Sequence, residues 1–142
     1  MSSRMSEGTE GPRETIVDIA LPWAVFRLGE AVRGHVNLTP VDPRAHADLA
    51  VYWECAGGLA LLTQGPIILL ARCIRLRIGV TVAVPFELPL PTDEPTTCTG
   101  GESSPAWFVV ARLDYAGSPG GSAEQVRCPI AVVNLTMGSL DD

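Results

Sequence analysis

Histidine and serine are the first residue types to test for catalysis, and neither stands in a catalytic arrangement in this sequence. The two histidines, His35 and His46, fall on the polar face of an expected strand and in or near a turn. A catalytic histidine needs an orienting partner and a pocket, and Ser103 and Ser104 lack a recognisable nucleophile setting. We therefore predict no catalytic residues and no enzyme activity; an unrecognised hydrolase is the alternative in that class.

Metal and cofactor sites are also not predicted. The four cysteines, Cys55, Cys73, Cys98 and Cys128, lie far apart without the close pairs that zinc sites use. No acidic segment has the spacing of a calcium loop. The glycines of 117–121 follow an expected strand but precede no helix, so they suit a turn rather than a phosphate site. We expect no bound metal, no cofactor and free thiols, as in the cytoplasm.

Three arginines form the candidate site. Arg75 and Arg77 share one face of an expected strand, and Arg72 lies close by. Such a basic patch could bind a partner that carries a phosphorylated peptide or an acidic lipid head group. The alternative is a solvated face that keeps an edge strand from pairing with other chains.

Charge and hydropathy exclude two classes of partner. The chain has 142 residues, 46% of them hydrophobic, and a net charge of −6, with ten arginines and no lysine. Binding to nucleic acid needs a basic face, so none is expected. The apolar stretch 59–71 is interrupted at 63–66, so no transmembrane segment is expected, and no apolar leader precedes Ile16. The arginine-rich, lysine-free composition suggests a GC-rich, bacterial genome, and we expect a cytoplasmic protein.

Alternation of apolar and polar residues with a period of two predicts strands along most of the chain. In 31–39 the apolar face holds Val32, Val36 and Leu38, and 106–113 is apolar on both faces, as a central strand would be. Gly79 falls inside a run that continues to Leu88, so it either sits inside a long strand or marks a bend or bulge in it. No segment has helical spacing with caps.

These elements predict an all-β fold, an immunoglobulin-like β-sandwich of about seven to nine mostly antiparallel strands. The polar residues 1–13 are expected to form a flexible tail, residues 14–136 the sandwich, and residues 137–142 a second flexible tail.

Three segments, in order, resemble the arrestin-like family. Residues 26–38 resemble its early strand pair, 84–91 its strand that ends in an aromatic residue and prolines, and 106–114 its next strand, which starts with an aromatic residue. The residues that carry the resemblance are Gly29, Glu30, Val32, Gly34, Val36, Phe86, Pro89 and Trp107. The pattern is most similar to bacterial sporulation-control arrestin-like proteins.

Physical chemistry gives these residues a role in the fold. Gly29 and Glu30 suit a turn, and Gly34 permits a close backbone approach. Phe86 and Trp107 suit inward anchors of the core. Family members usually carry two such sandwiches, whereas this chain holds one, and it lacks the lysines with which animal arrestins sense phosphate. The resemblance therefore implies the fold rather than that signalling role.

Two functions remain after these exclusions. The first is a non-enzymatic adaptor or scaffold that acts through protein contacts. Its partner, which the sequence does not identify, is another protein or a second copy of the chain in a homo-oligomer formed through edge strands. The alternative is a module that binds a sugar or lipid at the end loops of the sandwich, using the 89–105 loop and the aromatic residues Trp23 or Tyr115.

Overall fold

The computed structural model describes residues 15–41, 44–57, 62–93, 105–115 and 123–133, and every regular element in these ranges is a β-strand. The all-β prediction is confirmed. The tails predicted for 1–13 and 137–142 lie outside the described residues. The nine strands are β1 (Thr15–Ala20), β2 (Val25–Arg27), β3 (Ala31–Pro40), β4 (Arg44–Ala56), β5 (Leu62–Gln64), β6 (Ile68–Leu76), β7 (Val82–Pro89), β8 (Ala106–Tyr115) and β9 (Ala123–Val133).

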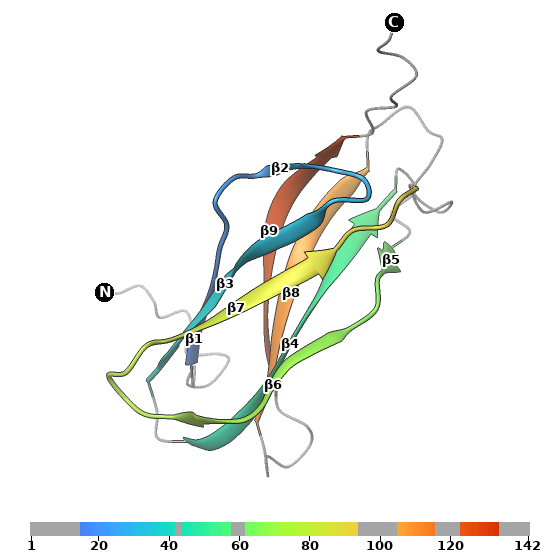
Figure 1. Ribbon diagram of the computed structural model, residues 1–142. Helices are drawn as coiled ribbons and strands as arrows, with labels where there is room; N and C mark the ends of the chain where they lie inside the picture. The colour runs from blue at the N-terminus through green and yellow to red at the C-terminus, as the bar shows by residue number, and fades with distance from the viewer. Residues whose placement is uncertain (1–14, 42–43, 58–61, 94–104, 116–122, 134–142) are drawn as a thin grey trace, which may run out of the picture.

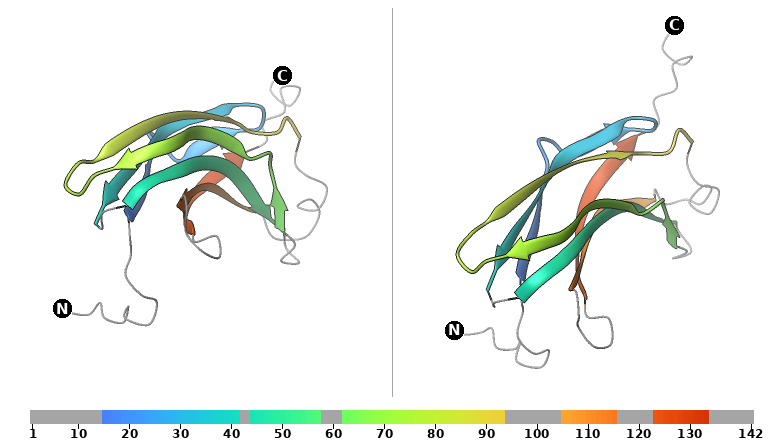
Figure 2. Two further views of the ribbon diagram at one scale, coloured as in Figure 1. Left: turned by 90° about the horizontal axis from the view of Figure 1, so that it is seen from below. Right: turned by 60° about the horizontal axis from the view of Figure 1, so that its bottom comes forward.

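The strands form two sheets that pack face to face (Figures 1 and 2). The smaller sheet has the order β1-β3-β7. The larger sheet runs β2-β9-β8-β4, and β4 is then paired with β5 along one part of its length and with β6 along another. All pairings are antiparallel except that of β2 with β9. The predicted sandwich is therefore confirmed.

The core lies between the sheets and is built by the alternation seen in the sequence. Val32, Val36 and Leu38 on β3 are fully buried, as are Val109 and Leu113 on the central strand β8. Such burial stabilises the fold by about 1.5–3 kcal/mol for each large apolar side chain. The inward positions of β4 and β7 complete this core.

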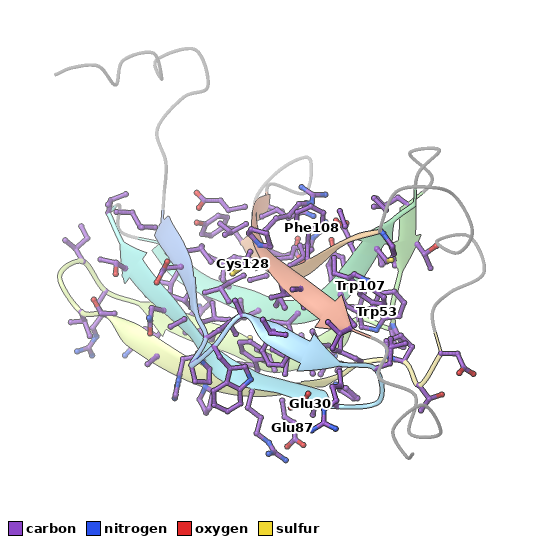
Figure 3. All side chains as sticks on the ribbon, turned by 90° about the horizontal axis from the view of Figure 1, so that it is seen from above. Glu30, Trp53, Glu87, Trp107, Phe108 and Cys128 are labelled. Carbon is purple, nitrogen blue, oxygen red and sulfur yellow. The ribbon has the colours of Figure 1, made fainter. Side chains whose placement is uncertain are left out.

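Two tryptophans close one end of the core, as Figure 3 shows. The rings of Trp53 on β4 and Trp107 on β8 are 5.4 Å apart at a tilted angle, a favourable arrangement for aromatic pairs. Gly65 donates its amide to the Trp53 carbonyl at 2.9 Å, and a Cβ atom on Gly65 would lie 2.2 Å from the Trp53 indole. Only glycine can therefore cover this ring.

Gly34 marks the place where the N-terminal segment changes sheets. β1 pairs with β3 as far as the partners Ala20 and His35, and the chain then enters β2, which pairs with β9 in the other sheet. A Cβ atom on Gly34 would lie 2.5 Å from the Ala20 carbonyl oxygen and 2.7 Å from the Leu21 side chain. The predicted close approach at Gly34 is confirmed, and the sheet change depends on it.

The other residues that carry the resemblance lie in the core, in a turn or at a strand end. Gly29 has a positive φ of 85°, in a turn closed by the Glu30 amide and the Arg27 carbonyl at 3.0 Å. Phe86 and Trp107 are 5% and 2% exposed, so they are inward anchors. Pro89 ends β7.

Some predictions were wrong. Gly79 does not lie inside a strand: it has a positive φ of 83° in a turn, where the Val80 amide donates to the Arg77 carbonyl at 3.1 Å. The apolar alternation continued through the turn and hid it. His46 lies within β4 rather than in or near a turn. Tyr115, predicted as an exposed contact for a ligand, is buried on β8 at 5% exposure.

Candidate functional site

The three predicted arginines lie along the outer edge of the larger sheet and the turn that follows it. Arg72 and Arg75 are on β6, Arg77 begins the turn to β7, and all three are exposed. None of their guanidinium groups has a hydrogen bond or ion pair to another described residue. By contrast, Arg33, Arg112 and Arg127 each bind a carboxylate.

A β-bulge separates Arg72 from Arg75. The pairing of β4 with β6 shifts register in three places, one of them between the pairs Ala47–Ile74 and Leu49–Ala71. Cys73 there has a φ of 54°, a left-handed conformation that is uncommon outside glycine. The Asp48 carboxylate accepts the Cys73 amide at 2.9 Å and holds the bulge. Bulges and charged side chains both discourage the addition of a further strand.

The outer edge of the smaller sheet is blocked by proline. The Leu90 amide donates to the Glu30 carbonyl at 2.9 Å, and in an antiparallel ladder such bonded pairs alternate with non-bonded ones. Pro85 and Pro89 occupy the non-bonded positions opposite β3, where an amide would point away from the sheet. The prolines therefore cost the ladder no hydrogen bond, and they remove donors from the free edge of β7.

β1 is covered at its outer edge as well. Thr15 is fully buried and Val17 is 8% exposed, and the Thr15 amide donates to the Glu124 carboxylate on β9 at 3.4 Å. The main-chain groups that these two residues direct away from β3 are therefore out of reach of a partner strand.

β9 has a regular edge along residues 123–128, where β1 lies beside it but forms no ladder with it. The Ala131 amide donates to the Ala24 carbonyl at 2.8 Å, so odd-numbered residues of β9 direct their main-chain groups away from β8. The pairing with β8 has no register shift from 123 to 130. Ala123, Gln125 and Arg127 therefore direct amides and carbonyls outward, and all three residues are exposed.

Two features support this orientation of β9. Pro129 occupies the next outward position, where its missing amide costs the β8–β9 ladder nothing. The short strand β2 already pairs in parallel with residues 131–133 of the same edge. The sequence alone did not identify this edge. The signal for it is that 123–128 contains no glycine or proline to interrupt a regular strand.

The outer face of the larger sheet holds a buried polar network next to this edge. The Arg127 guanidinium donates to both carboxylate oxygens of Glu54, at 2.7 and 3.2 Å, and the Gln125 amide group donates to the Tyr52 hydroxyl at 2.7 Å. Tyr52 and Glu54 are only 4% and 2% exposed. The Glu54 carboxylate raises the pKa of Arg127, mainly through their hydrogen bond. Burial, and then the Glu54 charge, raise the pKa of Tyr52.

An open apolar groove of about 760 Å³ lies where β1 ends. It is lined by residues 20–22, 33–35 and 85–87. Its polar rim includes Arg33 and Glu87, which form an exposed ion pair at 3.0 Å. His35 lies exposed beside them. Trp23, one of the predicted ligand contacts, is 58% exposed, and most of the 89–105 loop lies outside the described residues.

Reactive groups do not converge in the part of the chain that the structure describes. Cys55 is buried, Cys73 is exposed and Cys128 is half-buried; Cys98 lies outside the described residues, as do Ser103 and Ser104. Burial, followed by the Asp18 charge, raises the pKa of the Cys128 thiol. No group of three metal-ligating side chains occurs within the described ranges. None of these ranges contains a helix that is long and apolar enough to span a bilayer.

Comparison with known proteins places the fold. No family model matches the sequence, and no curated protein matches it. The structure is similar to Spo0M, the sporulation control protein of Bacillus subtilis, with a TM-score of 0.61 and 19% identity over 85% of this chain and 50% of Spo0M. The chain thus spans about half the length of Spo0M. The predicted arrestin-like fold is confirmed by this likeness.

Weaker likenesses extend to parts of two enzymes. A β-glucosidase from Listeria innocua has a TM-score of 0.42 and 17% identity over 84% of this chain and 16% of its own. The alkylpurine DNA glycosylase AlkC from Pseudomonas fluorescens has a TM-score of 0.43 and 16% identity over 87% of this chain and 33% of its own. Likenesses at this level tell nothing about activity.

Proposed function

We propose that this arrestin-like β-sandwich is a non-enzymatic adaptor that binds partner proteins by adding an extended segment to the open edge of β9. The observation that carries the proposal is the row of outward main-chain groups on Ala123, Gln125 and Arg127. They form a regular edge, whereas β6 carries bulges, β7 carries prolines and β1 is covered. Strand addition gives affinity through main-chain hydrogen bonds and selectivity through alternate side chains.

The parallel pairing of β2 with β9 supports the geometry. β2 ends its contact at residue 131, and an added segment would continue along the same edge over 123–129. The half-exposed side chains of Val126 and Cys128 would lie under it on the inner side. The occupant is therefore an extended segment with apolar residues at alternate positions, from another protein or from a second copy of this chain. A cytoplasmic location is part of the proposal, since it keeps thiols reduced.

The Gln125 amide can be tested with a matched pair of variants. Gln125→Pro and Gln125→Ala both remove the side-chain bond to Tyr52, but only the proline removes the outward amide. Affinity capture from the native lysate identifies the partner, and the purified pair is then titrated. We expect Gln125→Pro to bind at least about tenfold more weakly than Gln125→Ala, since one lost hydrogen bond and a steric clash exceed about 1.4 kcal/mol.

Hydrogen exchange adds an independent readout. The amides of Gln125 and Arg127 should exchange more slowly when the partner binds. If the partner is a second copy of the chain, the same protection should accompany self-association, which sedimentation measures. Equal affinity of the two Gln125 variants would overturn the proposed edge. A protein that stays monomeric and captures no reproducible partner would overturn the adaptor function itself.

The groove at the end of β1 favours a second candidate, a module that binds a small ligand, either a lipid or a sugar. Its volume lies in the range of small-molecule sites, about 300–1,000 Å³. The rim pair of Arg33 and Glu87 would orient polar groups of the ligand. Binding on a glycan or lipid array that Arg33→Ala weakens would support this candidate, and an empty array would rule it out.

A further inference from the structure

The turn between β6 and β7 stands free of the body of the protein. It runs from Arg77 to Val80 and is closed by one main-chain hydrogen bond of 3.1 Å. A Cβ atom placed on Gly79 would meet nothing within 4 Å. Ile78 and Val80 flank this glycine and are 56% and 47% exposed. Two large β-branched residues are thus about half exposed to solvent at a tip.

Other apolar side chains reach the surface at the same end of the sandwich. The hydroxyls of Thr81, beside the turn, and Thr39, near the end of β3, lie 3.1 Å apart. Val41 follows β3 and is 41% exposed, and Ile16, the partner of Thr39 on β1, is 46% exposed. Four of the nine large apolar residues that are exposed in the described part of the chain, Ile16, Val41, Ile78 and Val80, therefore gather at this end, which we call the apolar tip.

Positive charge flanks the apolar tip. Arg75 and Arg77 alternate with the inward side chains of Ile74 and Leu76, so both point outward directly beside the turn. The bulge at Cys73 keeps Arg72 exposed further along the same strand. The chain as a whole carries a charge of −6, so attraction to an anionic surface would have to come from these three arginines.

We infer that the apolar tip and its three arginines bind the surface of an anionic lipid bilayer. Apolar side chains with basic residues behind them are the pattern of interfacial membrane binding, in which the apolar part enters the head-group region. The shape favours a bilayer over an acidic peptide. The groove that the structure describes lies further along β3, at residues 33–35, whereas the tip projects outward and suits a deformable surface. This inference is independent of the β9 edge and goes beyond the proposed function.

Vesicle co-sedimentation tests the inference with controls of equal exposure and charge. The probes are vesicles of phosphatidylcholine alone and of phosphatidylcholine with phosphatidylglycerol. Ile78→Asp is compared with Val25→Asp, because the two side chains are 56% and 57% exposed. Arg75→Glu is compared with Arg27→Glu, which changes the net charge equally. β2, which holds both control positions, lies at the opposite end of β3 (Figure 1).

We expect binding to the anionic vesicles only, and weaker binding at high salt. Ile78→Asp should reduce binding at least about tenfold and Arg75→Glu at least about fivefold, since one basic residue near an anionic surface contributes about that factor. The two controls should bind like the unchanged protein. Thermal melting confirms that each variant is folded.

Three results would overturn the inference. The first is an absence of binding to anionic vesicles at low salt. The second is an equal loss of binding in Val25→Asp or Arg27→Glu, because the effect would then not belong to the tip. The third is complete displacement by free glycerol phosphate, because the site would then recognise a single head group or a soluble anion instead of a surface. Loss of partner capture in Gln125→Pro leaves vesicle binding intact, so the two proposals can fail separately.

Discussion

Replacing Arg127 by alanine should destabilise the protein by about 2–3 kcal/mol. The Glu54 side chain is only 3% exposed, and both of its oxygens accept hydrogen bonds from Arg127, at 2.7 and 3.2 Å. Removing one partner of a buried pair leaves the other charge buried and costs about 3–5 kcal/mol. We expect the smaller cost of about 2–3 kcal/mol because the Arg127 side chain is 48% exposed, so water can reach Glu54 in the variant.

Thermal and urea unfolding measure this cost. We expect the melting temperature to fall by roughly 6–12 °C, from about 3–4 °C per kcal/mol for a chain of this size. Arg112→Ala is the control, because its ion pair with Asp114 at 3.0 Å is exposed on both sides, at 44% and 46%. Exposed pairs contribute about 0–1 kcal/mol, so this variant should melt within a few degrees of the unchanged protein.

A second background separates the charge from the packing. In Glu54→Gln the residue stays polar but carries no charge, so adding Arg127→Ala should cost about 1–2 kcal/mol less than it does with Glu54 present. The pKa of Arg127 is raised, so the guanidinium stays charged and the cost should persist under mildly alkaline conditions. The reasoning is refuted if Arg127→Ala costs less than about 0.5 kcal/mol, or costs the same in both backgrounds.

Three further predictions concern packing and a thiol. Gly34→Ala should lower the free energy of unfolding by about 1–3 kcal/mol, measured in urea, because its methyl group would meet main-chain oxygen at 2.5 Å. Gly65→Ala should also cost at least about 2 kcal/mol, whereas Gly79→Ala should cost only about 1 kcal/mol, from its positive φ in open space; equal costs would contradict the packing argument. The pKa of Cys128 is raised, so less thiolate is present at a given pH. Asp18→Asn should lower that pKa and speed alkylation of this cysteine, as followed by mass spectrometry; an unchanged rate would contradict the role of Asp18.

Residues with strict alternation were the most predictable part of the fold. The inward face of β3 was predicted correctly, because one buried face imposes a period of two on the sequence. The prediction that β8 is a central strand, apolar on both faces, was also correct. No alternation marks β2, because three residues are too few to show any period, and only the resemblance to an early strand pair indicated a strand before the Gly29 turn. Its parallel pairing with β9 depends on contacts with the other end of the chain, which no local pattern records.

The candidate sites were less predictable because they depend on contacts between strands that lie far apart in the sequence. Tyr52 and Glu54 alternate with the inward residues of β4, and no local pattern could show that Gln125 and Arg127, far along the chain, would cover them. The exposure of Arg72, Arg75 and Arg77 was predictable from their charge. The choice of β9 over β1, β6 and β7 depends on knowing which strands lie at the edges of the two sheets, which requires the whole topology.

The change of sheets at Gly34 has a consequence for how the protein unfolds. β1 and β2 are consecutive pieces of one chain, yet β1 belongs to the smaller sheet and β2 to the larger one. Neither layer can separate without pulling this segment from the other, so the two layers should melt together in a single cooperative transition. The pairing of β2 with β9 joins the two ends of the chain and requires closure of the longest loop, so we expect it to form late in folding.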